Sequence, residues 1–459
     1  MAAKFITVDH DSPMLLPPDL RDWLPSEHMV HFIMDAVEAL DLSQARVNER
    51  GTGSAQYPPS MMLGLLIYCY ATGTFSSRRI ETLRHENVAV RYLCADTHPD
   101  HDSICKFRRE NKKLLSSAFH QVLELAARAQ VLKVGGLTVS VDGTKILACA
   151  SKHRAMSYGH VEKQLVLAEE QIAELLARAE DADSTPLQDG LSVPEEIKRR
   201  EDRIAKIKVA KREMEERAQA RYEEEKAAHK EKLEQREAKE KSSDRKTRGK
   251  KPKAPEEGPR AKDQYNFTDP ESRIMNPGGS FEQCFNAQAG VEVDTMLVVG
   301  QHVCNAPNDK EQLEPTVASI SPVIGRVSKV LADSGYYSEK AVTTVEEGEN
   351  GPMVYTAMKR HGHGRSIAQL EKREDPAAPP HGAPVPEVMA HRLETKECKD
   401  LYAKRKETVE PVFGIIKGAL GFHRFQLRGL EKVNLEWTLM TTSYNLKRLF
   451  NLGMRLKGA

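Results

Sequence analysis

Apolar positions at helical spacing dominate the first part of the chain. They recur in "HMVHFIMDAVEAL", "PSMMLGLLIYCYATG" and "LLSSAFHQVLELAARAQVL", and turns that carry Pro or Gly separate these segments. The pattern predicts helices between about residues 15 and 130. We therefore expect residues 1–130 to form a helical domain.

After residue 131 the pattern changes to the alternation that is typical of β-strands. The segment "GGLTVSVDGTKILACAS", residues 135–151, is rich in β-branched residues and predicts a central strand. Further strands are predicted in "SFEQCFNAQAGVEVDTMLVVGQHVC", in "KVLADSGYYS" and in "GPMVYTAM". A helical region from about residue 390 to 452 follows. This order predicts an α/β fold with a mixed sheet flanked by helices.

A long helical segment interrupts the strand pattern. Apolar residues at three-four spacing over residues 161–179, and again over 197–218, predict two helices joined by "STPLQDGLSVP". We expect residues 153–262 to form an antiparallel hairpin of the coiled-coil type, ending in a basic, extended linker. We prefer a protein partner over DNA for it, although its seam could simply hold its own two helices together. The α/β domain would then comprise residues 131–152 and 263–452.

Composition narrows the function classes only a little. The net charge is +1 although 29% of residues are charged, so overall charge does not decide whether the protein binds nucleic acid. Seven cysteines without a Cys-x-x-Cys pair do not describe a disulfide framework or a regular zinc module. In "CADTHPDHDSIC", Cys94, His98, His101 and Cys105 are zinc-capable. We prefer a metal-free interpretation because Pro99 and two aspartates interrupt the run.

The sequence predicts a soluble, cytoplasmic protein without a membrane partner. Its amino terminus, "MAAKFITVDHDSP", has no apolar signal core. The longest apolar run, near residues 61–71, is too short to span a bilayer.

Two aspartates differ from the strand pattern around them. Asp142 lies within a predicted strand, where a charge is costly without a partner or a metal. Asp333 follows a strand at the edge where open α/β sheets bind ligands, although a turn role is the simpler interpretation of this residue alone. With a glutamate from the last helical region, they would supply three hard carboxylate ligands for a pair of Mg²⁺ ions that act on a phosphodiester.

Five ordered stretches resemble the DDE transposases of bacterial insertion sequences. They are "VSVDGTKI", "FTDPESRIM", "CFNAQAGVEVD", "VLADSGYYS" and "KRKETVEPVFGIIKGALGFHRFQLRGLEKV". The resemblance extends to "YPPSMMLGLLIYCYATGTFSSRRIE" and "PDHDSICKFRRE" nearer the amino terminus. It implies an RNase H-like catalytic domain in which Asp142, Asp333 and Glu410 are the catalytic acids and the ligands of Mg²⁺, with Mn²⁺ as an alternative ion.

The third motif follows the family in part. Lys406 and Lys417 have the family's spacing to Glu410, whereas Tyr402 lies one residue earlier than the pattern requires. Helical geometry puts both lysines on the face of Glu410, which favours Glu410 over Glu407 as the third acid. A proline follows Glu410, and it predicts a kink or a restart of the helix there. A restart would leave Glu410 at a helix amino terminus.

The resemblance implies an enzyme that binds the ends of a mobile element as a homodimer, cleaves them, and joins the released 3′ hydroxyl to target double-stranded DNA. Such an enzyme would be associated with the nucleoid when DNA-bound. Candidate DNA-binding residues are Arg78, Arg79, Lys106, Arg108, Arg109, Lys406, Lys417, Arg424 and Arg428. Two alternatives remain open: a catalytically silent DNA-binding regulator and a metal-dependent nuclease with the same fold.

Three further pairs of polar residues lie in the motifs or the loops. For Asp269 and Arg273, a structural turn with an ion pair and a role in the active site are equally good interpretations. Asn286 and Gln288 are expected to make hydrogen bonds at the sheet edge or to steady a metal ligand. His361 and His363 are expected in a loop near DNA.

Overall fold

The computed structural model describes residues 19–47, 56–182, 193–243, 252–348, 351–358, 375–380 and 382–456. His361 and His363 lie outside these ranges. The chain divides into two compact units, residues 1–148 with 275–459, and residues 149–274. The division does not separate residues 1–130 from the sheet. None of the described helices is long and apolar enough to cross a membrane.

The amino-terminal part of the first unit is helical, as the spacing of its apolar residues predicts. Its helices are η1 (Leu20–Trp23), α1 (Met29–Glu38), α2 (Pro59–Ala71), α3 (Ser77–Glu86), α4 (Val88–Leu93), α5 (His101–Glu110) and α6 (Lys112–Arg128). Polar caps fix two of the starts, because the side chain of Asn87 accepts from the backbone of Val90 and that of Asp100 accepts from Ser103. Helix α2 is buried over nearly all of its surface.

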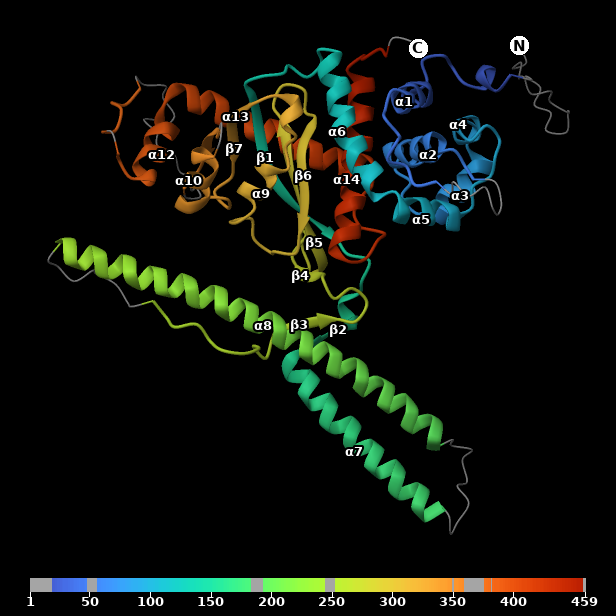
Figure 1. Cartoon of the computed structure of the whole chain (residues 1–459), viewed down its shortest axis with the longest axis vertical. Helices are drawn as coiled ribbons and strands as arrows, with labels where there is room; N and C mark the ends of the chain where they lie inside the picture. The colour runs from blue at the N-terminus through green and yellow to red at the C-terminus, as the bar shows by residue number, and fades with distance from the viewer. Residues whose placement is uncertain are drawn as a thin grey trace, which may run out of the picture. The chain divides into compact units, whose positions relative to one another are not determined.

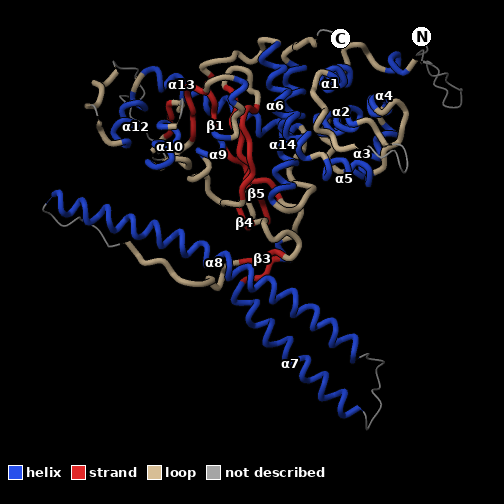
Figure 2. Tube along the Cα trace, viewed as in Figure 1, coloured by secondary structure: helices blue, strands red, loops and turns tan. Residues whose placement is uncertain are grey.

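A mixed β-sheet forms the centre of the first unit. Its strands in the described residues are β1 (Leu137–Leu147), β4 (Arg273–Met275), β5 (Glu282–Glu292), β6 (Val298–Cys304), β7 (Val327–Ala332) and β8 (Met353–Thr356). The order is β4-β5-β1-β7-β8, and β6 also pairs with β5. Strand β5 is antiparallel to β1 and β6, whereas β1, β7 and β8 run parallel. The structure thus confirms a mixed α/β fold (Figure 2).

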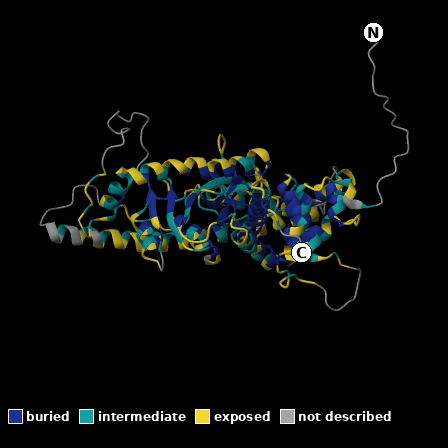
Figure 3. Cartoon of the chain, turned by 90° about the horizontal axis from the view of Figure 1, so that it is seen from above, coloured by how far each residue is buried: buried dark blue, intermediate teal, exposed yellow. Residues whose placement is uncertain are grey.

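Helices cover the sheet and connect it to the amino-terminal helices. They are α9 (Leu313–Ala318), η3 (Pro322–Ile324), α10 (Glu339–Glu347), α12 (Val385–Glu394), α13 (Lys396–Gly414) and α14 (Leu430–Asn451). Helix α14 is the most central: it packs against β6 and also against α1, α2 and α6 (Figure 1). It is buried along most of its length, and Trp437 is fully enclosed. Figure 3 shows the chain coloured by burial, with buried residues in dark blue. The sheet and the amino-terminal helices therefore share one core.

Helix α13 corrects the prediction of a restart at Glu410. The helix runs from Lys396 to Gly414 with Pro411 inside it, so Glu410 lies near its carboxyl-terminal end. A π-helical segment, η4 (Ile415–Ala419), follows directly. The local rule fails because Val409, Val412 and Phe413 are buried and hold this turn in the core. The π-helical turn also changes the residue spacing after Gly414, so the angular argument that linked Glu410 to Lys417 does not hold.

The second unit consists mainly of two long helices. These are α7 (Tyr158–Ala182) and α8 (Val193–Ser243), accompanied by η2 (Lys152–Arg154), β2 (Ala155–Ser157) and β3 (Gln264–Asn266). Val161 packs against Ile207, Ala210 and Met214 in an apolar cluster. The chain from residue 252 to 263 returns along α8, where Arg221 pairs with Asp263 and Arg260 pairs with Glu225. This part of the expected extended linker is therefore attached to α8.

Candidate active site

Two of the three predicted acids lie at neighbouring parallel strands. Val141 of β1 is paired with Ala332 of β7. Asp142 is the next residue of β1, and Asp333 directly follows the end of β7. The Asp142 carboxylate accepts from the backbone N–H of Gly143 at 2.8 Å. That of Asp333 accepts from the N–H of Gly335. Asp333 thus makes the turn contact expected of a strand-ending aspartate, beside the other acid.

Arg405 connects the first acid with the third. Its Nη1 lies 3.7 Å from Asp142 Oδ2, and its Nη2 lies 3.8 Å from Glu410 Oε1. Arg405 is 8% exposed, whereas the side chain of Glu410 is 53% exposed. A guanidinium from α13 therefore stands between a strand acid and a helix acid. Glu407 is exposed, like Glu410, but Arg405 forms its ion pair with Glu410.

The electrostatic setting of Asp142 favours a nearby cation. Burial is the main cause that raises the pKa of Asp142 to about 6, and the negative charges of Asp333 and Asp309 raise it further. The hydrogen bond from Gly143 and the charge of Arg405 oppose this rise. An additional positive ion here would stabilise the ionised carboxylate.

Two tyrosines hold the acid-bearing segments together. Tyr402 of α13 donates its hydroxyl to the carbonyl oxygen of Ala332 at 2.9 Å, just before Asp333. Tyr336, which is buried, donates to Gln288 Oε1, and its backbone N–H donates to the carbonyl of Asp333. Burial raises the pKa of Tyr336 well above its usual value, and the charges of Asp142, Asp309 and Asp333 add to the effect. The Tyr336 hydroxyl is therefore close enough to all three acids for their negative charges to disfavour its ionisation.

Asp309 is an acidic residue of this region that the sequence analysis missed. Its Oδ1 accepts from Asn286 Nδ2 at 2.7 Å, Gln288 Nε2 at 2.8 Å and Lys145 Nζ at 3.2 Å. Asn286 and Gln288 are fully buried, so the expectation that they satisfy hydrogen bonds at the site is supported, with Asp309 as their acceptor. Asp309 lies in the loop "NAPNDKEQ", where no periodicity marks it.

Among the described residues, no group of three or more His, Cys, Asp and Glu side chains is arranged to hold a metal ion. The donor types nevertheless suit Mg²⁺ or Mn²⁺, because Asp142, Asp333 and Glu410 offer only hard carboxylate oxygens. The guanidinium of Arg405 lies beside two of these three carboxylates. The acids are thus near one another, with a cationic side chain between two of them.

The basic residues predicted to bind DNA differ in their exposure. The exposed ones are Arg78, Arg79, Lys106, Arg109, Lys406, Arg424 and Arg428. Phe422 and Phe425 beside the last two are buried and in edge-to-face contact, as aromatic anchors of this segment would be. Lys417 is half-buried and donates to the carbonyl of Lys145 at 2.9 Å. Burial is the main cause that lowers its pKa.

Arg108 is the exception among these residues, because it lies in the interior. It is 4% exposed and donates to the hydroxyl of Tyr70 at 3.1 Å and to Ser77 Oγ. Tyr70 in turn donates to Glu436 of α14 at 3.2 Å. The guanidinium of Arg108 thus belongs to a buried network between α2, α5 and α14. Its spacing of four from buried Ile104 is the sequence signal that could have indicated this.

Asp269 and Arg273 fall within the second unit, whose last residue, Ile274, lies inside β4. Arg273 donates to the carbonyls of Pro270 and Ser272, both at 2.8 Å, and burial lowers its pKa to about 10. Asp269 is fully buried beside the same turn. These contacts favour the structural interpretation of this pair.

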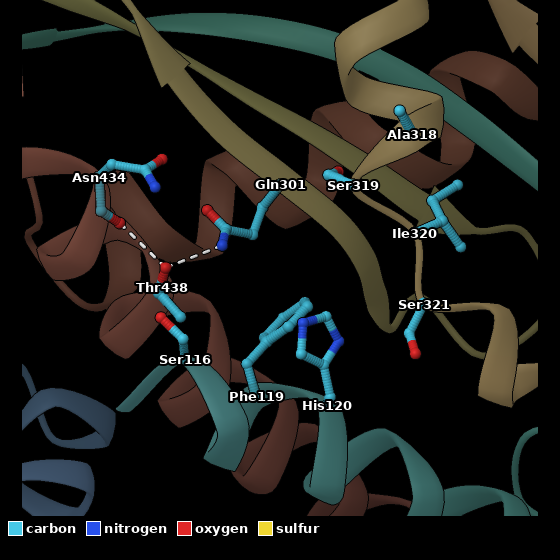
Figure 4. A pocket seen from close by; sticks show the side chains of 10 residues that line it. All are labelled: Ser116, Phe119, His120, Gln301, Ala318, Ser319, Ile320, Ser321, Asn434 and Thr438. Carbon is cyan, nitrogen blue, oxygen red and sulfur yellow. Dashed lines mark hydrogen bonds between the residues drawn. The ribbon is translucent and has the colours of Figure 1, made fainter. Parts of the chain in front are cut away.

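A pocket of about 410 Å³ lies in the first unit between α6, β6 and α14 (Figure 4). The acids are not among its lining residues, which are Ser116, Phe119, His120, Gln301, Ala318, Ser319, Ile320, Ser321, Asn434 and Thr438. Gln301 donates to Thr438 Oγ1 across it at 2.8 Å. The candidate active site is therefore separate from this cavity.

Comparisons with known proteins identify the family. Residues 242–446 match the model of the transposase DDE domain, and residues 18–110 match that of a transposase domain (DUF772). The first match includes Asp333 and Glu410 but begins after β1, which carries Asp142. Searches of curated proteins and of solved structures gave no match. The two family matches, in the order expected along one chain, support a DDE transposase of an insertion sequence.

Proposed function

We propose that this transposase cleaves the ends of its element and transfers the strands to target DNA by metal-dependent phosphoryl transfer at Asp142, Asp333 and Glu410. The observation that carries the proposal is the contact of Arg405 with both Asp142 and Glu410, at 3.7 Å and 3.8 Å. Asp333 lies beside Asp142 in the sheet, because Ala332 and Val141, the residues before them, are paired. In this proposal the three carboxylates, from three distant segments of the chain, come together around the metal ions, as metal-dependent phosphoryl transfer requires.

The arrangement of the strands supports an RNase H-like catalytic domain. Strands β6, β5 and β1 lie side by side in this order, and β5 is antiparallel to both of the others. Strands β7 and β8 follow next to β1 and run parallel to it. The first acid is in the central strand, the second at the end of its parallel neighbour and the third on a helix packed against both. In this proposal the second unit is an insertion of the coiled-coil type between β1 and β5.

Asp142, Asp333 and Glu410 would hold Mg²⁺ or Mn²⁺. When bound, such ions would increase the nucleophilicity of the attacking oxygen and stabilise charge on the leaving oxygen of the phosphodiester. The contribution of the chain is to place the acids. Gly143 orients the Asp142 carboxylate by its N–H, and Tyr402 fixes α13 to the end of β7.

Double-stranded DNA would be held by exposed cationic side chains. Arg78, Arg79, Lys106 and Arg109 of the amino-terminal helices would contact phosphates of the element ends, and Lys406, Arg424 and Arg428 would contact phosphates near the acids. Binding would weaken steeply with salt because each phosphate contact releases a counterion. We include pairing of two ends by a homodimer in the proposal.

The test uses labelled DNA fragments that carry the sequences flanking the gene. The purified full-length protein is incubated with each fragment and a supercoiled plasmid, in Mg²⁺ or in EDTA. We expect cleavage at the element end and joining to the plasmid in Mg²⁺ only. Cleavage without joining would indicate a nuclease, and binding without either reaction would indicate a silent regulator.

A further inference from the structure

Arg405 is a buried cation held only loosely by its acidic neighbours. Its distances of 3.7 Å to Asp142 and 3.8 Å to Glu410 are both longer than hydrogen bonds. Its Nε is buried without a hydrogen-bond partner among the described residues. The guanidinium lies 5.9 Å from the centre of the Tyr402 ring. This side chain is kept close to the acids without being fixed by strong directional contacts.

Its charge makes Arg405 important for any metal ion at this site. Arginine stays protonated even when buried, so the positive charge is permanent. Near Asp142 and Glu410 it reduces the repulsion between carboxylates that no metal has neutralised. The same charge repels an incoming divalent cation and occupies space beside two of its ligands.

We propose that Arg405 is a positioning residue that serves as the built-in counter-ion of the metal-free acids and must move aside when a divalent cation binds. The inference rests on the proposed function, because it takes these acids as metal ligands. Arg405 thereby limits the affinity of the free protein for metal. The acids stay close together before DNA and metal bind. The free energy needed to displace Arg405 is then subtracted from the free energy of metal binding.

A purely structural role for Arg405 predicts the opposite result. If the guanidinium only held the acids in place, its removal would let them separate, and metal binding would weaken. If it competes with the metal, its removal strengthens metal binding. The direction of the change in metal affinity therefore distinguishes the two roles.

The experiment measures binding of Mn²⁺ and of Mg²⁺ to the full-length protein without DNA, by titration calorimetry. The variants are Arg405→Met, which keeps the bulk and removes the charge, and Lys404→Met as the matched control. Lys404 is the preceding residue and is half-exposed, 3.9 Å from Asp294. We expect Arg405→Met to bind metal about tenfold more tightly than the wild type. Lys404→Met should change the affinity less than twofold.

Thermal unfolding in EDTA establishes whether each variant is folded. If Arg405→Met does not fold, Arg405→Gln decides the question, because it also removes the charge but keeps a polar end group. We expect Arg405→Gln to bind metal more tightly than the wild type. Equal or weaker metal binding by a folded Arg405 variant overturns this inference and leaves the proposed function standing. If neither the wild type nor the variants bind metal, the metal site of the proposed function fails as well.

Discussion

Gly143 faces Gln288 across the β1–β5 pair, and a Cβ added at Gly143 would overlap the Nε2 atom of Gln288. The same Cβ would lie 2.8 Å from Asp309 Oδ1 and 2.9 Å from Asn286 Oδ1. The hydrogen of Gly143 thus leaves room for the polar cluster around Asp309. The glycine after the first acid is required by this close approach.

We predict that Gly143→Ala disrupts this cluster and destabilises the protein by about 1–3 kcal/mol, because a buried overlap forces the side chains apart. Urea unfolding measures the change. Gly414→Ala is the control, since nothing lies within 4 Å of a Cβ at this helical glycine. It should be neutral or stabilising by up to about 1 kcal/mol. Equal effects of the two substitutions would contradict the crowding at Gly143.

Asp309 should stabilise the fold because it accepts hydrogen bonds from buried side-chain amides. We predict that Asp309→Ala costs about 1–3 kcal/mol, because the amides of Asn286 and Gln288 lose their shared acceptor in the interior. Asp309→Asn retains an oxygen and should cost less. Glu311→Ala, at an exposed acid two residues further on, serves as the control in the same unfolding measurements and should be neutral. A neutral Asp309→Ala would show that these donors find other partners.

The raised pKa of Asp142 predicts a dependence of stability on pH in EDTA. The folded-state pKa is about 6 and the ordinary value is 3.8, so the folded protein binds this proton more tightly. Its contribution to stability is complete below about pH 4 and is lost as the pH rises through 6. Asp142→Asn cannot titrate, so its stability relative to the wild type should rise over this range. A constant difference between the two proteins, measured by urea unfolding at several pH values, would rule out the shift.

Arg108 and Arg109 are adjacent in sequence but should behave differently. Arg108→Ala leaves the buried Tyr70 and Glu436 without their cation, and we predict a loss of about 3 kcal/mol or more of unfolding free energy. Arg109→Ala, at an exposed site, should change stability by less than about 0.5 kcal/mol. It should weaken DNA binding and reduce the slope of log affinity against log salt by about 1. The reverse pattern in melting and salt-titration experiments would contradict both assignments.

The sequence was sufficient to predict the two strands at which the candidate acids Asp142 and Asp333 lie. The alternation around Asp142 and the small residues before Asp333 predict two strands, and the structure pairs them in parallel. Such patterns are informative because a strand in the core must bury apolar side chains at a period of two. The family matches then confirm the resemblance that the ordered motifs indicated.

The polar contacts of the site could not be predicted in the same way. Asp309 and Lys145 are 164 residues apart, and no local pattern records that they meet. Arg405 and Arg108 are buried within runs of basic residues that are typical of solvated surfaces. At Pro411 the packing of its neighbours outweighs a local rule about helix breaks. Tertiary contacts decide each of these cases.

The central claim, that Asp142, Asp333 and Glu410 form the metal-dependent active site, is tested most directly by comparing Glu410→Gln with Glu407→Gln. Both proteins are first shown to fold and to bind the labelled element end equally, and Mg²⁺-dependent cleavage of that end is then measured. Asp142→Asn and Asp333→Asn are measured alongside, and we expect both to lose cleavage. We also expect Glu410→Gln to abolish cleavage and Glu407→Gln to retain most of it. Cleavage that persists in Glu410→Gln and disappears in Glu407→Gln would contradict the account.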